Sequence, residues 1–168
     1  MWTGTGRPAG GSWKAYRRAM PITLDSLDDV ISQSRRFGAT AFIATTRPDG
    51  RPHAVPVAVN WIDGSLTAFV ANPSVKVSNV RSNPFAMVHF AVSEANGWDS
   101  LMLEGPATLV DTVAGRKALW DRMGYDLATF EPGGPTADSH AFIQVSPTRA
   151  TLLEMYGIKG KSTWKLFA

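Results

Sequence analysis

The residues best suited to binding a charged ligand lie in a short stretch bounded by two prolines. Asn72 and Pro73 suit the cap and the first position of a helix, and Pro84 prevents the helix from continuing. The first turn of such a helix would offer free backbone N–H groups, the hydroxyl of Ser74 and the ammonium of Lys76. Together these groups form a place for a phosphate. The alternative is an ordinary capped surface helix with a solvated lysine.

The sequence offers few residues suited to other kinds of chemical site. Cysteine is absent, which excludes disulfides, thiolate metal ligands and cysteine nucleophiles. The three histidines, His53, His89 and His140, lack the close spacing of a helical metal motif, so we predict no metal site. His89 alternates with apolar residues and is interpreted as structural. His53 has either a structural role or a role in hydrogen bonding to a ligand or substrate.

Composition sets the broad class of the protein. The 168 residues, 44% hydrophobic, are enough for one domain with a real core. Residues 1–20 are glycine-rich and basic and predict an irregular leader, followed by a single domain over 21–168. A net charge of +3 and a pI near 9.4 favour acidic small molecules over nucleic acid. The sequence has no long apolar run, so we expect a cytoplasmic protein with no membrane partner.

The elements that position the short helix are mostly strands. A helix capped at Thr23, with apolar residues three and four apart, is expected to end at Gly38. After it the apolar period changes to two, which indicates strands. The predicted strands are Ala41–Thr46, Pro52–Trp61, Ser65–Ala71, Phe85–Val92, Ser100–Leu109, Ala141–Val145 and Ala150–Met155. A tight turn is predicted at Asp63-Gly64.

A further helix is expected to open at Asp111 or Thr112 and to close at Gly124. The chain then ends in a basic and aromatic stretch, Lys159–Phe167. Six or seven antiparallel strands with helices inserted between them favour a mainly β fold. We therefore predict a small antiparallel barrel with the helices packed outside.

Four sequence blocks, in their order and spacing, resemble the pyridoxamine 5′-phosphate oxidase-like superfamily of FMN-binding split barrels. The blocks are Thr46–Val57, Asp63–Leu66, Ser74–Pro84 and Leu103–Ala107. The first and third are most similar to the actinobacterial subgroup that uses the deazaflavin coenzyme F-420. The resemblance implies a six- or seven-stranded split β-barrel. It also implies a homodimer that binds its cofactor, coenzyme F-420 or FMN, in a groove at the subunit interface.

The resemblance also implies which residues bind the cofactor. The phosphate would lie against the segment that contains Ser74, Lys76, Val77 and Asn79. The ring would lie along the strand that contains His53, Val55, Pro56 and Val57, with backbone from Val70, Ala71 and Asn72 contributing. The subgroup often ends in a basic and aromatic strand that reaches the partner's cofactor. Trp164 is matched to that strand, and Trp98 is a second candidate for lining the site.

Some positions depart from the pyridoxamine phosphate oxidases proper. Those enzymes carry an arginine where this chain has Val75, and basic residues where it has Val57 and Ala58. Their Arg-x-His substrate motif has no match near the C-terminus. A role in vitamin metabolism is therefore not expected.

The expected function is hydride transfer to or from a small conjugated substrate. The cofactor supplies this chemistry, so no catalytic triad is required and no catalytic residue is assigned. A non-catalytic protein that binds a flavin, haem or bilin is the alternative, with His53 or His89 as the axial ligand of a haem. A structural dimer with an empty groove is a third possibility.

Overall fold

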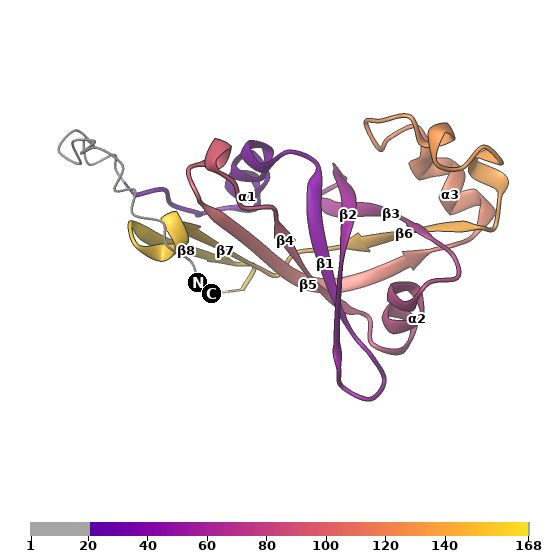
Figure 1. The fold of residues 1–168 in the computed structure, drawn as a ribbon, viewed down its shortest axis with the longest axis horizontal. Helices are drawn as coiled ribbons and strands as arrows, with labels where there is room; N and C mark the ends of the chain where they lie inside the picture. The colour runs from indigo at the N-terminus through magenta and orange to yellow at the C-terminus, as the bar shows by residue number, and fades with distance from the viewer. Residues whose placement is uncertain (1–20, 168) are drawn as a thin grey trace, which may run out of the picture.

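The strands of the computed structural model, which describes residues 21–167, close into an antiparallel barrel (Figure 1). The barrel strands are β1 (Thr40–Thr46), β2 (Pro52–Ile62), β3 (Ser65–Ala71), β4 (Phe85–Phe90), β5 (Ser100–Val110) and β6 (His140–Val145). Their pairing runs β1-β2-β3-β6-β5-β4 and returns to β1. Outside the barrel, β5 also pairs with β7 (Arg149–Glu154), which pairs with β8 (Gly160–Lys165).

The predicted mainly β split barrel is confirmed: six strands close it, and the described residues form eight strands in all, one more than the seven predicted from the sequence. The extra strand is β8, which lies inside the stretch expected only to be basic and aromatic. The predicted leader, residues 1–20, lies outside the described residues. Asp63 and Gly64 both have positive φ (50° and 74°), as a tight hairpin between β2 and β3 requires.

Strand β5 belongs to both sheets of the split barrel, and Gly105 makes this possible. The first half of β5 pairs with β4 and β7, and the second half pairs with β6. At the crossover the backbone oxygen of Ser146 comes so close that a Cβ on Gly105 would lie 2.0 Å from it. Any side chain at position 105 would therefore push the two strands apart.

Three helices pack outside the barrel: α1 (Leu27–Ser34), α2 (Val75–Ser82) and α3 (Val113–Trp120). The predicted cap of the first helix was wrong. Ser26, not Thr23, caps α1, because its hydroxyl and the carboxylate of Asp29 form a reciprocal capping box. Thr112 caps α3, one of the two start positions expected. Among the described residues, no helix combines the length and the apolar composition needed to cross a membrane.

The start of α2 also differs from the prediction. Ser74 occupies the N-cap position with extended backbone (φ −152°, ψ 162°), so Asn72 and Pro73 precede the helix. The helix ends before Pro84, as expected, with Asn83 as its C-cap. Because Ser74 occupies the N-cap position, its side chain belongs to the same helix end as the first free backbone N–H groups of α2.

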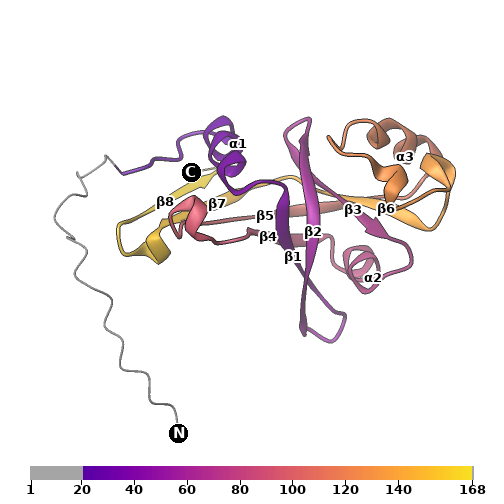
Figure 2. The ribbon, with the colours of Figure 1, turned by 45° about the horizontal axis from the view of Figure 1, so that its top comes forward.

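Two apolar cores hold these elements together. The larger fills the barrel and includes inward residues of all the strands, among them Ile43, Val59 and Leu103. The smaller lies on the outer face of β3 and β6, where Phe142 packs with Leu119 and Leu127. Residues 111–139, which carry α3 and two short 3₁₀ helices, η4 (Leu127–Thr129) and η5 (Gly134–Thr136), cover this face. We call residues 111–139 the insert. Figures 1 and 2 show it at the end of the barrel where α2 also lies.

Candidate functional site

A hollow of about 210 Å³ lies between α2, the insert and the outer surface of β2 and β3. We call it the α2 hollow. It is lined by Pro56, Val57, Ala58, Phe69, Val70, Ala71, Lys76, Tyr125 and Phe130. Five of these were predicted from the sequence as cofactor-binding residues: Pro56, Val57, Val70, Ala71 and Lys76. The strands form its floor and α2 supplies its only lysine.

The N-terminus of α2 carries a polar group whose hydrogen-bonding capacity is unused. The Ser74 Oγ is buried, and it neither caps the helix nor bonds to any other described residue. Buried polar atoms are nearly always paired in proteins, so an unpaired one indicates a missing partner. The backbone N–H groups of the first turn also lack partners within the helix. A phosphate at this place would satisfy both.

Lys76 is the cation nearest to these donors along the chain. Its side chain is half-buried, and this burial lowers the pKa of the ammonium from its ordinary value. No ion pair among the described residues involves Lys76. A partly desolvated ammonium without a counterion gains more from a bound anion than a fully solvated one does. The residues present therefore fit a phosphate-bearing group.

Strand β2 divides the predicted ring-binding residues between its two faces. Pro56 and Ala58 point outward and are exposed, whereas Val57 and Val59 are buried. His53 and Val55 fall on the same side of the strand as Val57 and do not line the α2 hollow. Val55 packs against the barrel core instead. The contact of His53 with a ligand stays a prediction.

Three other predicted residues hold the site in place from behind. Asn79 is 2% exposed, and its Nδ2 donates to the Thr45 Oγ1 at 2.9 Å, which ties α2 to β1. Val77 is buried in the barrel core. The Asn72 Nδ2 donates to the backbone oxygen of Asp138 at 3.0 Å, which joins the end of β3 to the insert. These contacts position the hollow without lining it.

The structure does not bring the predicted tryptophans to the α2 hollow. Trp164 lies on β8, which Figure 1 places at the opposite end of the molecule. Its side chain is 7% exposed and belongs to the barrel core, so the indole has little surface left for a ligand. Trp98 is exposed and stacks on Tyr156, with ring centroids 6.2 Å apart.

Sequence reasoning missed the two aromatic residues that do line the hollow. Tyr125 and Phe130 come from the insert and meet edge to face, with centroids 6.2 Å apart and planes at 90°. Partial burial raises the pKa of the Tyr125 phenol. The only signal in the sequence was two aromatic residues close together in a region rich in glycine and proline.

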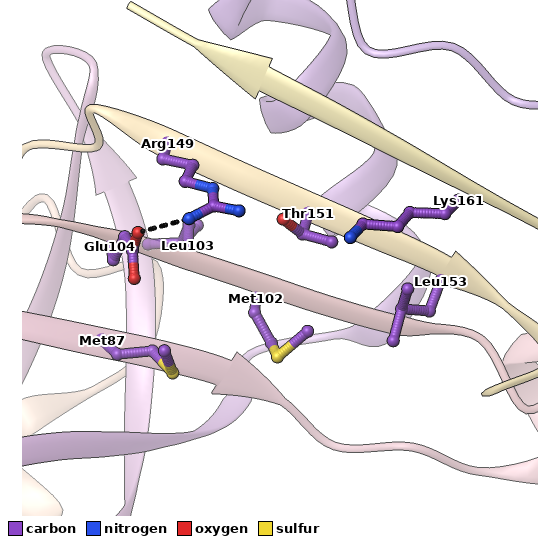
Figure 3. A pocket seen from close by; sticks show the side chains of 8 residues that line it. All are labelled: Met87, Met102, Leu103, Glu104, Arg149, Thr151, Leu153 and Lys161. Atoms are coloured by element: carbon purple, nitrogen blue, oxygen red, sulfur yellow. Dashed lines mark hydrogen bonds and ion pairs between the residues drawn. The ribbon is translucent and has the colours of Figure 1, made fainter. Parts of the chain in front are cut away.

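A second hollow, of about 240 Å³, lies on the face formed by β4, β5, β7 and β8 (Figure 3). We call it the sheet-face hollow. Its lining is Met87, Met102, Leu103, Glu104, Arg149, Thr151, Leu153 and Lys161. Here Arg149 already has a counterion, because its Nη1 lies 3.5 Å from the Glu104 Oε1. Met87 and Met102, from the neighbouring strands β4 and β5, contribute apolar lining to this hollow.

The sheet-face hollow is part of a larger exposed surface. One cross-strand row joins Pro56, Phe42, His89, Met102, Thr151 and Thr163. On this face Phe42, Phe85 and Met87 are 43%, 45% and 37% exposed. Pro56 also lines the α2 hollow, so the row reaches one edge of that hollow.

The histidines do not form a metal centre. The described residues contain no group of three His, Cys, Asp or Glu side chains placed to hold a metal ion. The His89 Nε2 lies 2.8 Å from the Ser100 Oγ, which agrees with its predicted structural role. His140 is 1% exposed among the rings of Phe69, Trp120 and Phe142, and neither of its ring nitrogens has a hydrogen-bond partner among the described residues.

Known structures share this fold. A heme binding protein from Mycobacterium smegmatis aligns with a TM-score of 0.65 at 16% identity, covering 86% of this chain and 60% of that one. A pyridoxamine 5′-phosphate oxidase-related, FMN binding protein from Nostoc punctiforme aligns with a TM-score of 0.60 at 16% identity, covering 83% and 94%. An F-420 reductase aligns with a TM-score of 0.55 at 24% identity, covering 70% and 94%.

No curated protein matches the sequence. The family assignment comes from the sequence itself, because residues 28–154 match the pyridoxamine 5′-phosphate oxidase family. This match spans the barrel from α1 to the end of β7 and includes α2 and the insert. The chain therefore belongs to the pyridoxamine 5′-phosphate oxidase family.

Proposed function

We propose that this protein is an oxidoreductase that uses coenzyme F-420 or FMN to transfer hydride to or from a small conjugated substrate. The observation that carries the proposal is the half-buried Lys76, which lines the α2 hollow without an ion pair among the described residues, two positions after the unpaired, buried Ser74 hydroxyl. Family membership and the folds of the F-420 reductase and the FMN binding protein support it. A cytoplasmic location stays a prediction.

Different residues in and around the hollow bind different parts of the cofactor. Ser74, the first N–H groups of α2 and the Lys76 ammonium hold the phosphate. The outward faces of β2 and β3, at Pro56, Ala58 and Ala71, support the ring. When bound, the cofactor supplies the hydride chemistry. The chain's task is to fix the ring's position and leave one face open to substrate.

A neighbouring hollow bears on the choice between the two cofactors. It has a volume of about 380 Å³ and is lined by Arg47, Pro48, Asp49, Val75, Ser78 and Asn79, so it adjoins α2. Asp49 is paired with Arg51, whereas Arg47 has no ion pair among the described residues. The acidic tail of coenzyme F-420 would form an ion pair with the Arg47 guanidinium. FMN has a single phosphate and no acidic tail, so its binding does not require Arg47. We therefore expect Arg47→Ala to weaken coenzyme F-420 binding and leave FMN binding unchanged.

A second copy of this chain is the expected partner. The exposed row carries the apolar side chains of Phe42 and Met102 on either side of His89, and it reaches the α2 hollow at Pro56. An uncovered apolar sheet face of this kind is a liability for a monomer. We propose that two copies pack through this face, which would bring the α2 hollow to the interface.

A non-catalytic binding protein is the second candidate. It is favoured by the likeness in fold to the mycobacterial heme binding protein. No histidine lines the α2 hollow, so a haem there would need a ligand other than His53, His89 or His140. A Soret band that disappears in His53→Ala or His89→Ala would favour this candidate over the enzyme.

The test is a fluorescence titration of purified protein with coenzyme F-420 and with FMN. Lys76→Ala removes one charge-assisted contact, so we expect the dissociation constant to rise about 10- to 100-fold. Lys117→Ala, an exposed lysine on α3, is the matched control and should leave it unchanged. Binding of neither cofactor to the wild-type protein would refute the proposed function.

A further inference from the structure

We propose that Tyr125 and Phe130 determine which ring the α2 hollow accepts, by closing the hollow with an aromatic wall that contacts the ring directly. This inference rests on the proposed function, because it assumes that a phosphate-bearing ring compound occupies the hollow. It goes beyond it by assigning ring selection to the insert, a segment outside the resemblance on which the cofactor residues were predicted.

The wall exposes apolar surface where a ligand would lie. Phe130 is 67% exposed although it sits beside a hollow, and its ring meets Tyr125 edge to face. The floor of the same hollow includes Pro56, Ala58 and Ala71, from β2 and β3. A planar conjugated ring between this floor and the wall would cover the exposed face of Phe130. A non-planar or strongly polar group would not cover this face of Phe130.

The wall is held rigidly enough to select. Leu127, between the two aromatic residues, is 1% exposed and belongs to the smaller core. The buried Arg116 donates through Nη1, Nη2 and Nε to backbone oxygens of Asp111, Thr136 and Pro135, which closes the insert on itself. Arg122 forms a two-pronged pair with Asp63 at 2.6 and 2.9 Å, which fastens the insert to the β2–β3 turn.

The floor of the hollow is supported from below. Phe69 lines the hollow, and its ring contacts Trp120, His140 and Phe142 at centroid distances of 6.3, 5.2 and 5.7 Å. The aromatic packing of the smaller core therefore continues to the surface that a ring would touch. A site with aromatic side chains from both the insert and β3 discriminates by shape, because a planar ring can contact both.

The experiment separates the wall from the phosphate site. Each cofactor is titrated next to its phosphate-free ring compound, FMN with riboflavin and coenzyme F-420 with its phosphate-free deazaflavin. The variants are Phe130→Ala and Lys76→Ala, with Phe167→Ala as the control because that side chain is 84% exposed at the far end of the chain. Phe130 is largely exposed, so the variant is expected to fold.

We expect Phe130→Ala to raise the dissociation constants of a cofactor and of its phosphate-free ring by the same factor, about 3- to 10-fold. Lys76→Ala should weaken only the phosphate-bearing member of each pair. Phe130→Leu, which keeps apolar bulk without the ring, should weaken both members as well. Unchanged binding of the ring compounds to Phe130→Ala would overturn the inference and leave the proposed function standing. Equal affinities of Lys76→Ala and wild type would refute the phosphate site instead.

Discussion

The α2 hollow and the sheet-face hollow are similar in volume, about 210 and 240 Å³, but they differ in the state of their charges. In the sheet-face hollow Arg149 is paired with Glu104, and Lys161 is exposed to solvent. In the α2 hollow Lys76 is half-buried without an ion pair among the described residues, and the unpaired Ser74 hydroxyl precedes it by two positions at the start of α2. An anion gains little by entering a site whose charges are already compensated or solvated. The comparison teaches that unused hydrogen-bonding and charge capacity marks a ligand site better than volume does.

The largest expected effect removes the anchor of the insert. Arg116 is 3% exposed and bonds to three backbone oxygens of the insert, so Arg116→Ala removes the donor from three part-buried hydrogen bonds. We expect a loss of about 3 kcal/mol in the free energy of unfolding, measured by urea denaturation. Lys117→Ala, at the next position on the exposed side of α3, should cost nothing measurable. Equal stabilities of the two variants would show that the insert does not depend on Arg116.

The next prediction concerns the exposed row that borders the sheet-face hollow. Phe42 lies in this row between Pro56 and His89 and is 43% exposed, so Phe42→Glu would bury a carboxylate in the proposed dimer interface. We expect the dimer to weaken by about 2 kcal/mol or more, roughly 30-fold in its dissociation constant. Light scattering coupled to size-exclusion chromatography measures this. Ile158→Glu, at an 80% exposed residue outside the row, is the control. A monomeric wild-type protein would remove the reason for the prediction.

A pH dependence of stability should appear at His140, on the α2 side of the molecule. Burial among aromatic rings lowers the pKa of His140, the charge of Arg116 lowers it further, and Glu131 opposes both. The unfolded chain therefore takes up the proton first as pH falls through about 6.5, and stability that is fully present above that pH is lost below it.

The size of this loss is at most about 1.4 kcal/mol per pH unit. Urea midpoints at pH 7.5 and 5.5 should differ more for the wild type than for His140→Phe, which keeps the aromatic packing without a titrating group. Parallel pH profiles of the two proteins would mean that His140 has the same pKa in the folded and the unfolded chain.

The smallest expected effect is the change in cofactor affinity when Lys161, the lysine of the sheet-face hollow, is replaced. Lys161 lines the sheet-face hollow and is exposed, so Lys161→Ala should change the dissociation constant of either cofactor by less than about 2-fold. Lys161→Ala tests which of the two hollows binds the cofactor, because it removes from the sheet-face hollow the same charge that Lys76→Ala removes from the α2 hollow. A loss as large as that of Lys76→Ala would make the sheet-face hollow part of the binding site.

Local sequence signals were enough to predict most of the barrel. The β1–β3 hairpins follow from alternating apolar residues and the Asp63-Gly64 turn, both of which depend on neighbours in the chain. The helix caps were less certain, because several residues near each start can cap. Ser26 with Asp29 three residues later was the signal that would have identified the start of α1.

The site was predicted only in part. Lys76 and the strand residues beside it could be found because they lie in contiguous blocks. Tyr125 and Phe130 could not, since their place over the hollow depends on long-range contacts of Arg116 and Arg122 with no local pattern. The match of Trp164 to a strand that reaches the partner's cofactor stays a prediction, since within its own chain the indole packs in the barrel core.

The most direct test of the account is a crystal structure of the protein with the tighter-binding of FMN and coenzyme F-420. In this complex we expect a phosphate within hydrogen-bond distance of the Ser74 Oγ and the Lys76 Nζ. We also expect the ring between the β2–β3 floor and Phe130. A cofactor bound between Met87, Met102 and Lys161 in the sheet-face hollow, with Ser74 and Lys76 empty, would contradict the account.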